Sequence, residues 1–346
     1  MTVGIGVVGA GVVGSRRAAS AGQSPRSRLE AVVDVDVSRA SAVAATYGCR
    51  HFTDWRGLLD DPAVDAVAVC TVNKWLAPIT IAALEAGRAV LCEKPMGRNG
   101  AEATAMADAA RRSGRPLKVG FTLRFQRGLA TARRLCADGV LGPLYCIRAV
   151  YGHGGREGYE REWRMDPDLA GGGELLDQGV HLLDLARWFL GDFEQVHGLV
   201  PSWHWGTGAV DDNAFVLLSN HRGQVASLHA SWTQWKNRFQ LEVCGRDGSL
   251  EVEGLGGSYG PERVTLRRRN ERSGPPEEEV VPLGPAASVW DADWADFMDA
   301  IELGRQPAVG GGDALEVMRM VDRVYEASRP LVASAPGSRS SGSLCP

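Results

Sequence analysis

Two short segments of the chain combine residue types that can bind ligands and move protons. The first is Glu93-Lys94-Pro95, which directly follows an apolar run that ends at Cys92. If this run is a parallel strand, Lys94 lies at its carboxyl end, where doubly wound sheets bind their ligands. Pro95 disfavours helical dihedral angles at Lys94 and so fixes the exit of the chain. A strand-end lysine is more often a solvated surface residue, so this segment alone does not establish a catalytic role.

The second segment follows three consecutive glycines, 171–173. From Glu174 onward the pattern predicts a helix that is apolar except at Asp177, His181 and Asp184. Spacings of four and three residues place those three side chains on one helix face, and aligned polar groups need partners if they are buried. The carboxylate either satisfies the histidine structurally or orients the imidazole for proton transfer near neutral pH. The sequence leaves both interpretations open.

A glycine-rich turn near the N-terminus indicates a dinucleotide site. Gly9-Ala10-Gly11-Val12-Val13-Gly14 follows an apolar run and opens an Ala-rich helix, and Asp34 ends the next apolar run. The first glycine permits the tight turn, the second lets the backbone approach a pyrophosphate, and the third lets the helix pack on the strand. The helix N-terminus offers free N–H groups to the phosphates. Asp34 would bind ribose hydroxyls and repel a 2′-phosphate, so the sequence predicts NAD rather than NADP.

The first third of the sequence alternates short apolar runs with helical segments. Strands are predicted at 4–8, 29–33, 64–70, 89–92 and 117–121, with helices between them at about 12–22, 38–47, 79–86 and 101–112. This alternation predicts an α/β fold, a doubly wound parallel sheet with helices on both faces.

From about residue 123 the pattern changes to a helix at 127–137 followed by strands with hairpin turns. The strands are predicted at 144–151, 194–200, 214–218, 225–233, 239–244, 249–253 and 263–268, with a solvated loop at 270–279 and closing helices near 291–303 and 313–327. This pattern predicts a C-terminal α+β domain with a mostly antiparallel sheet. We expect a nucleotide-binding domain at 1–122, a substrate-binding and oligomerisation domain at 123–330, and a disordered Ser/Gly-rich tail at 331–346.

The composition excludes several classes of protein. The 346 residues carry 38 Lys and Arg against 42 Asp and Glu, a net charge of −4, so nucleic acid is not an expected partner. No apolar run approaches the roughly 20 residues needed to cross a bilayer, and the N-terminal apolar run precedes its arginines, unlike a signal peptide. The seven cysteines are odd in number and lack metal-type spacing. We therefore expect a cytoplasmic protein without membrane contact or a bound metal.

With these residues in view, the chain resembles the Gfo/Idh/MocA family of nicotinamide-dependent oxidoreductases, as far as about residue 328. The likeness rests on the glycine motif, Asp34, Thr71-Val72-Asn73, Glu93-Lys94-Pro95, and the triple glycine with Asp177 and His181. It implies a Rossmann domain followed by a domain with a large open sheet, whose outer face often builds dimers or tetramers. A homodimer or homotetramer is therefore expected. One segment departs from the family, because Lys74 and Leu76 stand where many members carry histidines, which puts substrate analogies there in doubt.

The resemblance implies catalysis by Lys94, Asp177 and His181. The residues expected to hold NAD are Gly9, Gly11, Val12, Val13, Gly14, Asp34, Thr71, Asn73, Glu93 and Lys94. Those expected to bind substrate are Glu160, Trp163, Arg164, Asp177 and His181. The expected reaction is hydride transfer from a secondary alcohol carbon to C4 of NAD, with His181 as general base and Lys94 bonding the developing oxyanion or relaying the proton. Which of these two takes the proton is left open.

The substrate class follows from family analogy, which favours pyranosides, sugar nucleotides or cyclitols, and from acidic residues. Carboxylates at Glu157, Glu160, Glu162 and Glu174 would suit a polyol or a cationic aminosugar, although a solvated loop explains 157–162 equally well. We expect a sugar, aminosugar or cyclitol hydroxyl to become a ketone, with an aminoglycoside-type aminosugar as first choice, ahead of transamination in natural-product biosynthesis. The tryptophans at 203, 205, 232 and 235 suit a subunit interface better than sugar stacking. A glycoside hydrolase that recycles bound NAD and a non-catalytic dinucleotide-binding sensor remain alternatives.

Overall fold

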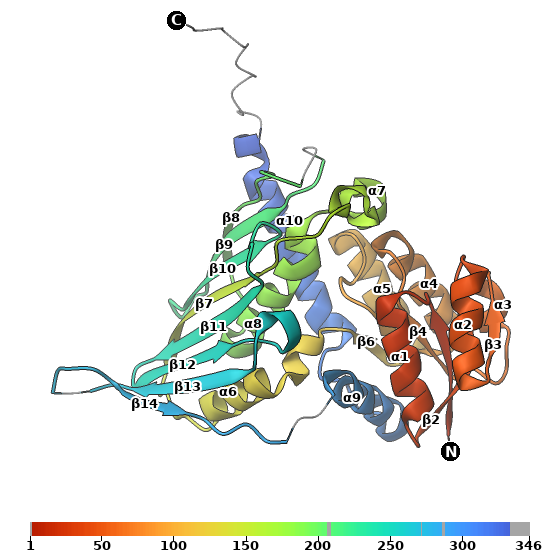
Figure 1. Cartoon of the computed structure of the whole chain (residues 1–346), viewed down its shortest axis with the longest axis horizontal. Coiled ribbons are helices and arrows are strands. Elements are labelled where there is room, and N and C mark those ends of the chain that lie inside the picture. The colour runs from red at the N-terminus through yellow and green to blue at the C-terminus, as the bar shows by residue number, and fades with distance from the viewer. Residues whose placement is uncertain (1, 206–208, 271, 286–287, 333–346) are drawn as a thin grey trace, which may run out of the picture.

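The computed structural model describes residues 2–205, 209–270, 272–285 and 288–332, which form two sheets with helices around them (Figure 1). The predicted disordered tail lies outside the described residues, except that 331 and 332 end the last helix. No helix within these ranges is both long and apolar enough to cross a bilayer.

The first sheet is parallel and has six strands in the order β3-β2-β1-β4-β5-β6. Its elements are β1 (Val3–Val8), α1 (Val12–Gln23), β2 (Ser27–Val33), α2 (Val37–Tyr47), β3 (Arg50–Phe52), α3 (Arg56–Leu59), β4 (Ala66–Val69), α4 (Asn73–Glu85), β5 (Ala89–Cys92), α5 (Gly100–Ser113) and β6 (Leu117–Val119). Alternate residues of the central strands enter two separate cores. In β4, Val67 and Val69 pack with α4 and α5, and Ala66 and Ala68 pack with α1. Burial on both faces explains why these strands are continuous apolar runs in the sequence.

The second sheet has eight strands in the order β14-β13-β12-β11-β7-β10-β9-β8 and is antiparallel except for the β7–β10 pair. Its strands are β7 (Leu144–Gly152), β8 (Gln195–Leu199), β9 (Asn213–Ser219), β10 (Val225–Ser231), β11 (Arg238–Gly245), β12 (Gly248–Glu253), β13 (Arg263–Arg268) and β14 (Glu277–Val280). Its α-helices are α6 (Arg127–Ala137), α7 (Pro167–Ala170), α8 (Val180–Leu190), α9 (Val289–Leu303) and α10 (Gly311–Val332), with short turns η1 (Thr122–Phe125), η2 (Tyr159–Arg161), η3 (Trp163–Met165), η4 (Leu175–Gly179) and η5 (Gly257–Tyr259). Helices α6, α8 and α10 lie between this sheet and the first one (Figure 1). The predicted fold class, a Rossmann domain plus an α+β domain with a large, mostly antiparallel sheet, is confirmed.

Part of the loop predicted at 270–279 is instead the edge strand β14. This strand pairs with β13, and every one of its four residues is exposed. Arg267 contacts Glu278 at 2.8 Å and Arg268 contacts Glu279 at 3.5 Å. Cross-strand charge pairs hold such an edge, so no apolar alternation marks it in the sequence.

Helix α9, predicted to close the second domain, packs against the first one. Trp294 and Phe297 enter the core beneath α1. Arg17 of α1 is fully buried and forms ion pairs with Asp293 at 2.5 Å and with Glu93 at 2.6 Å. Buried ion pairs between distant parts of the chain thus hold α9 against the first domain, although the sequence places α9 in the second. The boundary at 122/123 stays a prediction.

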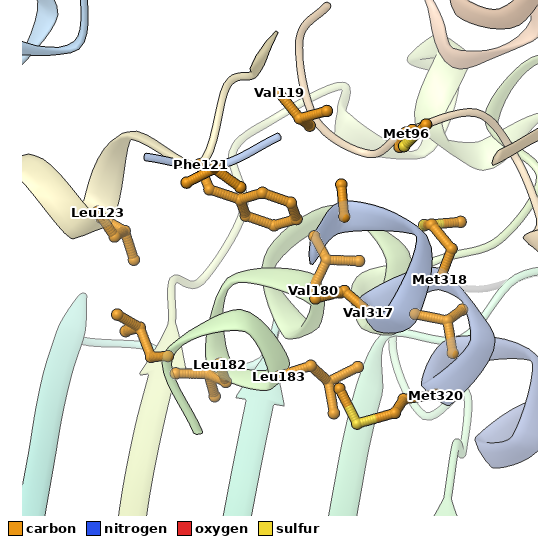
Figure 2. Close-up of a cluster of buried hydrophobic side chains, with 14 of the residues drawn as sticks. Met96, Val119, Phe121, Leu123, Val180, Leu182, Leu183, Val317, Met318 and Met320 are labelled. Carbon is orange, nitrogen blue, oxygen red and sulfur yellow. The ribbon is translucent and has the colours of Figure 1, made fainter. Parts of the chain in front are cut away.

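A shared hydrophobic core joins the two halves beneath the site. Figure 2 shows Met96, Val119 and Phe121 from the first half facing Val180 of α8 and Met318 of α10. This packing fixes α8 relative to the carboxyl ends of β5 and β6, and therefore fixes the polar residues carried at those ends.

Candidate active site

The glycine turn between β1 and α1 is closed toward the protein and open on one side. Gly9 has a φ of +97°, and a Cβ there would lie 2.4 Å from the carbonyl oxygen of Cys70. A Cβ at Gly14 would lie 1.7 Å from the carbonyl oxygen of Gly9. A Cβ at Gly11 would meet no described atom within 4 Å. The turn therefore has open space at Gly11, the second glycine of the motif, where the backbone must approach the pyrophosphate.

The surroundings of this turn fit the pyrophosphate and ribose of a dinucleotide. Helix α1 starts at Val12 directly after Gly11, which has no side chain to cap it, so its first N–H groups are available to phosphates. Val12 is 75% exposed, and a bound cofactor would cover it. Asp34 directly follows β2, and its carboxylate accepts a hydrogen bond from the Ala10 amide at 2.7 Å. This bond holds the carboxylate beside the turn, where it can receive ribose hydroxyls.

Other residues predicted to hold the cofactor have protein partners. The Asn73 amide donates to the carbonyl oxygen of Ala170 at 2.8 Å, and the Thr71 hydroxyl donates to the next carbonyl along the chain at 3.1 Å. Glu93 lines the central cavity and accepts from Arg17 Nε at 2.8 Å. Asn73 thus links α4 to the end of α7, directly before the triple glycine. NAD contacts by these residues stay predictions.

Asp211 fixes the backbone that leads to Asp177. Its carboxylate accepts from the amides of Gly173 at 3.0 Å and Leu175 at 2.8 Å, and from the Tyr325 hydroxyl at 2.8 Å. A Cβ at Gly173 would lie 1.9 Å from the Asp211 carbonyl oxygen, so only glycine fits there. The chain then enters η4, a π-helical turn that carries Asp177; such turns occur frequently at functional sites.

Lys94 and Asp177 meet between the two domains. Lys94 Nζ donates to Asp177 Oδ1 at 2.8 Å and to the Asp177 carbonyl oxygen at 2.5 Å. Arg164 Nε donates to the other carboxylate oxygen at 3.1 Å. Burial alone would raise the pKa of Asp177, but Lys94 and then Arg164 outweigh it and hold that pKa below its ordinary value. Asp177 is therefore a fixed anion that positions the lysine.

His181 lies one helical turn beyond this pair and is buried. Burial, and then the charge of Lys94, lower the pKa of His181 well below its ordinary value, so the imidazole is neutral at neutral pH. Its Nδ1 has no hydrogen-bond partner among the described residues. A neutral, unpaired imidazole facing a cavity can accept a proton from a ligand.

The predicted stripe of three polar residues is divided between two environments. No hydrogen bond links Asp177 to His181 among the described residues, because Lys94 and Arg164 take both carboxylate oxygens. Asp184 is buried and accepts two bonds from Arg124, at 2.9 and 2.6 Å. The structure therefore does not show Asp177 orienting the imidazole. Asp184 is bonded to Arg124 and has a structural role.

The candidate catalytic residues line one cavity of about 260 Å³. Its lining residues are Val13, Glu93, Lys94, Gly120, Thr122, Tyr151, His153, Arg156, Tyr159, Arg164, Asp177, Gln178, His181 and Trp290. Val13 belongs to the dinucleotide turn, whereas Tyr151 and His153 come from the end of β7 and the residues after it. The cavity therefore connects the cofactor turn to the second sheet, as a hydride-transfer site must.

Two residues predicted to bind substrate lie outside this lining. Glu160 is exposed on η2 and pairs with Arg161 at 3.0 Å. Trp163 is covered by the Arg164 guanidinium, 4.6 Å from its ring centroid. Trp232, expected on an exposed surface, is instead fully buried against Tyr159.

Comparison with known proteins agrees with this arrangement. The family described as "Oxidoreductase family, NAD-binding Rossmann fold" matches residues 3–121, and the "GFO/IDH/MocA C-terminal domain" matches 129–251. The chain belongs to the Gfo/Idh/MocA family. It is therefore an NAD-dependent oxidoreductase, as the sequence predicts.

Individual Gfo/Idh/MocA proteins resemble this chain over most of its length. It is 27% identical to levoglucosan dehydrogenase of Pseudarthrobacter phenanthrenivorans, covering 71% of this chain and 72% of that one. It is 30% identical to 1,5-anhydro-D-fructose reductase of Ensifer adhaerens, covering 90% and 91%. Aldose-aldose oxidoreductase of Caulobacter crescentus, solved with glycerol, superposes with a TM-score of 0.85 at 28% identity, covering 95% and 98%.

Several lining residues of this Gfo/Idh/MocA cavity were not predicted from the sequence. Tyr151, His153 and Tyr159 reach it from β7 and η2, and Trp290 reaches it from the start of α9. Gln178 lies inside the segment at 171–181. Its position next to Asp177 was the one feature of the sequence that could have indicated its place in the cavity. No group of residues suited to hold a metal occurs in the described ranges.

Removing the Asp34 carboxylate should weaken NAD binding. An Asp34→Ala variant loses both the ribose acceptor and the bond to the Ala10 amide, so we expect Kd for NAD to rise roughly 10- to 100-fold. NADP should be affected less, because the repulsive charge disappears. Titration of tryptophan fluorescence measures both constants, with the exposed Asp54→Ala as the matched control. An unchanged NAD affinity in Asp34→Ala would contradict this role.

The neutral state of His181 predicts the acid limb of the pH profile. The lowered pKa of His181 means that the imidazole stays a competent base as pH falls from 8 to about 6.5, the ordinary imidazole value. We expect kcat/KM for alcohol oxidation to show no loss from this group over that interval and to fall only at lower pH. A fall in the kcat/KM of the wild type that is centred at or above about pH 6.5 and is absent in His181→Asn would contradict this prediction. It would show that the protein stabilises the charged imidazole instead.

Proposed function

We propose that this protein oxidises a secondary hydroxyl group of a neutral sugar or cyclitol to a ketone, with NAD as the hydride acceptor. The observation that carries the proposal is the position of Lys94, held 2.8 Å from Asp177 beside the neutral His181. This group lines the cavity that also reaches the dinucleotide turn at Val13. Relatives named for levoglucosan and 1,5-anhydro-D-fructose support a sugar as substrate.

In the proposed reaction the carbinol C–H bond breaks and its electron pair leaves as hydride. Bound NAD supplies the acceptor carbon. Lys94 has three N–H donors, of which Asp177 occupies two, so the third can bind the substrate oxygen as negative charge develops. His181 accepts the hydroxyl proton, and the C=O bond forms. Assignment of the proton to His181 rather than Lys94 rests on the neutral, unpartnered state of the imidazole.

The charges around the cavity favour a neutral substrate over the cationic aminosugar predicted from the sequence. Glu162 lies between Arg156 at 2.5 Å and Arg164 at 3.3 Å, so two cations already neutralise it. Glu174 is fully buried, and burial and then Asp177 raise its pKa well above the ordinary value, which disfavours its charged form. Glu160 lies outside the lining, and the lining carboxylates Glu93 and Asp177 are already bonded to Arg17 and to Lys94 and Arg164. The described lining therefore offers no free carboxylate to an ammonium group.

The test is NADH formation, followed by absorbance, with NAD and with NADP. The panel contains D-glucose, levoglucosan and myo-inositol as neutral substrates and glucosamine as the aminosugar. We expect turnover with NAD on at least one neutral compound. Turnover on glucosamine alone would restore the aminosugar hypothesis and a place in aminoglycoside biosynthesis. No turnover with NAD tightly bound would favour the recycling hydrolase or the sensor.

We also propose that two or four copies associate through the open face of the second sheet. Leu199 lies opposite Phe215 in the β8–β9 register, and both are exposed with Leu217. Trp203, also exposed, packs on Phe215 with ring centroids 5.8 Å apart. We call these four side chains the apolar outer face; patches of this kind mark interfaces.

A lysine within the apolar outer face should disrupt this assembly. We expect Leu217→Lys to reduce the molar mass measured by light scattering from a dimer or tetramer to a monomer. Val280→Lys, an equivalent change on the exposed edge strand β14, should leave the mass unchanged. A monomeric wild-type protein would contradict the proposed association.

We propose a reducing compartment, the cytoplasm, as the site of action. The proposal is supported by the thiols at 49, 70, 92, 136, 146 and 244, which are free in the described part of the chain. Intracellular proteins keep their cysteines in this state.

A further inference from the structure

We propose that Gln178 is a specificity residue that binds a substrate hydroxyl adjacent to the one oxidised. The inference rests on the proposed sugar oxidation and names the feature of the sugar that this site recognises. Gln178 lines the cavity and is only 7% exposed. Its Nε2 donates to the Tyr259 hydroxyl at 3.2 Å, while Oε1 has no partner among the described residues.

The carboxamide is held so that one end stays available to a ligand. Tyr259 projects from η5, in the connection between β12 and β13, and its ring lies 5.5 Å from that of Tyr151. Tyr151 in turn lies 6.1 Å from the His181 ring. Tyr259 holds the Nε2 end of the carboxamide, so the unpartnered, buried Oε1 is the end of this cavity-lining side chain that is left for a ligand hydroxyl.

Gln178 is placed to contact the same ligand as the catalytic group. It follows Asp177 directly in the π-helical turn η4, and Asp177, Gln178 and His181 all line the same cavity. A ring that presents one hydroxyl to Lys94 and His181 therefore presents a neighbouring hydroxyl to Gln178. A hydroxyl group both donates and accepts, so it satisfies whichever end of the carboxamide is free.

A buried acceptor without a partner carries a desolvation cost that a ligand hydroxyl removes. A site built in this way rejects an analogue that lacks the hydroxyl, because the polar group then stays unpaired. We expect the protein to discriminate by roughly 10- to 100-fold in kcat/KM against a deoxy analogue at one carbon that flanks the oxidised one.

The experiment compares side-chain removal with hydroxyl removal. kcat/KM is measured for D-glucose and its 2-, 3- and 4-deoxy analogues, and for myo-inositol and its monodeoxy analogues, with wild type, Gln178→Leu and Tyr259→Phe. In Gln178→Leu we expect the parent compound to lose roughly 10- to 100-fold while the matching deoxy analogue is unchanged, so that the discrimination ratio approaches one. Tyr259→Phe, which releases Nε2, should reduce the same ratio in part, through KM. Gln195→Leu, the same change on the exposed edge strand β8, should alter nothing.

The outcomes separate this inference from the function on which it rests. If wild type oxidises a parent compound and Gln178→Leu slows parent and all deoxy analogues equally, Gln178 is structural and the inference is wrong while the proposed function stands. The inference is also wrong if a folded Gln178→Leu variant keeps the wild-type ratio of kcat/KM for the parent compound to kcat/KM for the deoxy analogue. If wild type oxidises none of these compounds or the panel above, the proposed function fails and the specificity role fails with it.

Discussion

Lys94→Ala is expected to lower kcat/KM for sugar oxidation by about 100- to 10,000-fold, the usual contribution of a positioned proton-transfer or oxyanion-binding group. Among the described residues, Lys94 is the only lysine in the cavity lining, so in this variant the developing oxyanion loses its lysine donor. Asp177 keeps Arg164 as a partner at 3.1 Å, and Lys94 is partly exposed, so the variant should fold. Steady-state kinetics of NADH formation and circular dichroism measure the two properties.

Lys74→Ala is the matched control for this prediction. Lys74 also pairs with a carboxylate, Asp168, at 2.6 Å, but on the surface of the protein. Its removal should change kcat/KM less than about threefold, since exposed ion pairs contribute about 0–1 kcal/mol. Equal effects of the two substitutions would place the chemistry elsewhere.

Arg17→Met should cause the largest loss of stability. Arg17 is buried between Glu93 and Asp293, and Asp293 also contacts Lys118 at 2.9 Å. Breaking a buried charge network by removing one partner costs about 3–5 kcal/mol, because the remaining charges stay buried without compensation. We expect the melting temperature to fall by on the order of 10 °C.

Arg39→Met provides the comparison for the buried network. Arg39 pairs with Asp36 at 3.3 Å on the surface of α2, and its replacement should cost at most about 1 kcal/mol. Calorimetric unfolding of both variants gives the difference. Similar melting temperatures would show that the buried network contributes no more than a surface pair. Asp293→Asn combined with Arg17→Met should recover part of the loss.

Features set by local backbone requirements could be predicted from the sequence. The glycine turn is an example, because the positive φ of Gly9 and the close approach of Gly14 to the Gly9 carbonyl oxygen act within a few residues and leave a pattern in the chain. The alternating elements of the Rossmann sheet are another, since burial on both faces makes each strand an apolar run. The motif at 93–95 and the segment at 171–181 predicted a candidate site at the carboxyl end of β5, and Lys94, Asp177 and His181 line one cavity there.

Features set by contacts between distant residues could not be predicted in this way. The carboxylate of Asp177 points to Lys94 and Arg164 rather than to His181, because Lys94, which follows β5, and Arg164 of η3 bond its two oxygens. Acidic residues near the site suggested a cationic substrate, but their charge depends on neighbours and burial. Glu162 is paired with two arginines, and burial raises the pKa of Glu174 and so disfavours its charged form. Helix α9 joined the first domain through buried ion pairs that no local pattern reveals.

The central claim is that this cavity transfers hydride from a sugar carbon to NAD. The most direct measurement uses D-glucose and myo-inositol deuterated at every carbon, incubated with NAD and the protein, with the cofactor pool analysed by mass spectrometry. We expect deuterium in free NADH, accumulating over many turnovers and nearly absent with Lys94→Ala. Cofactor that stays unlabelled in solution while the protein binds NAD normally would contradict a net dehydrogenase.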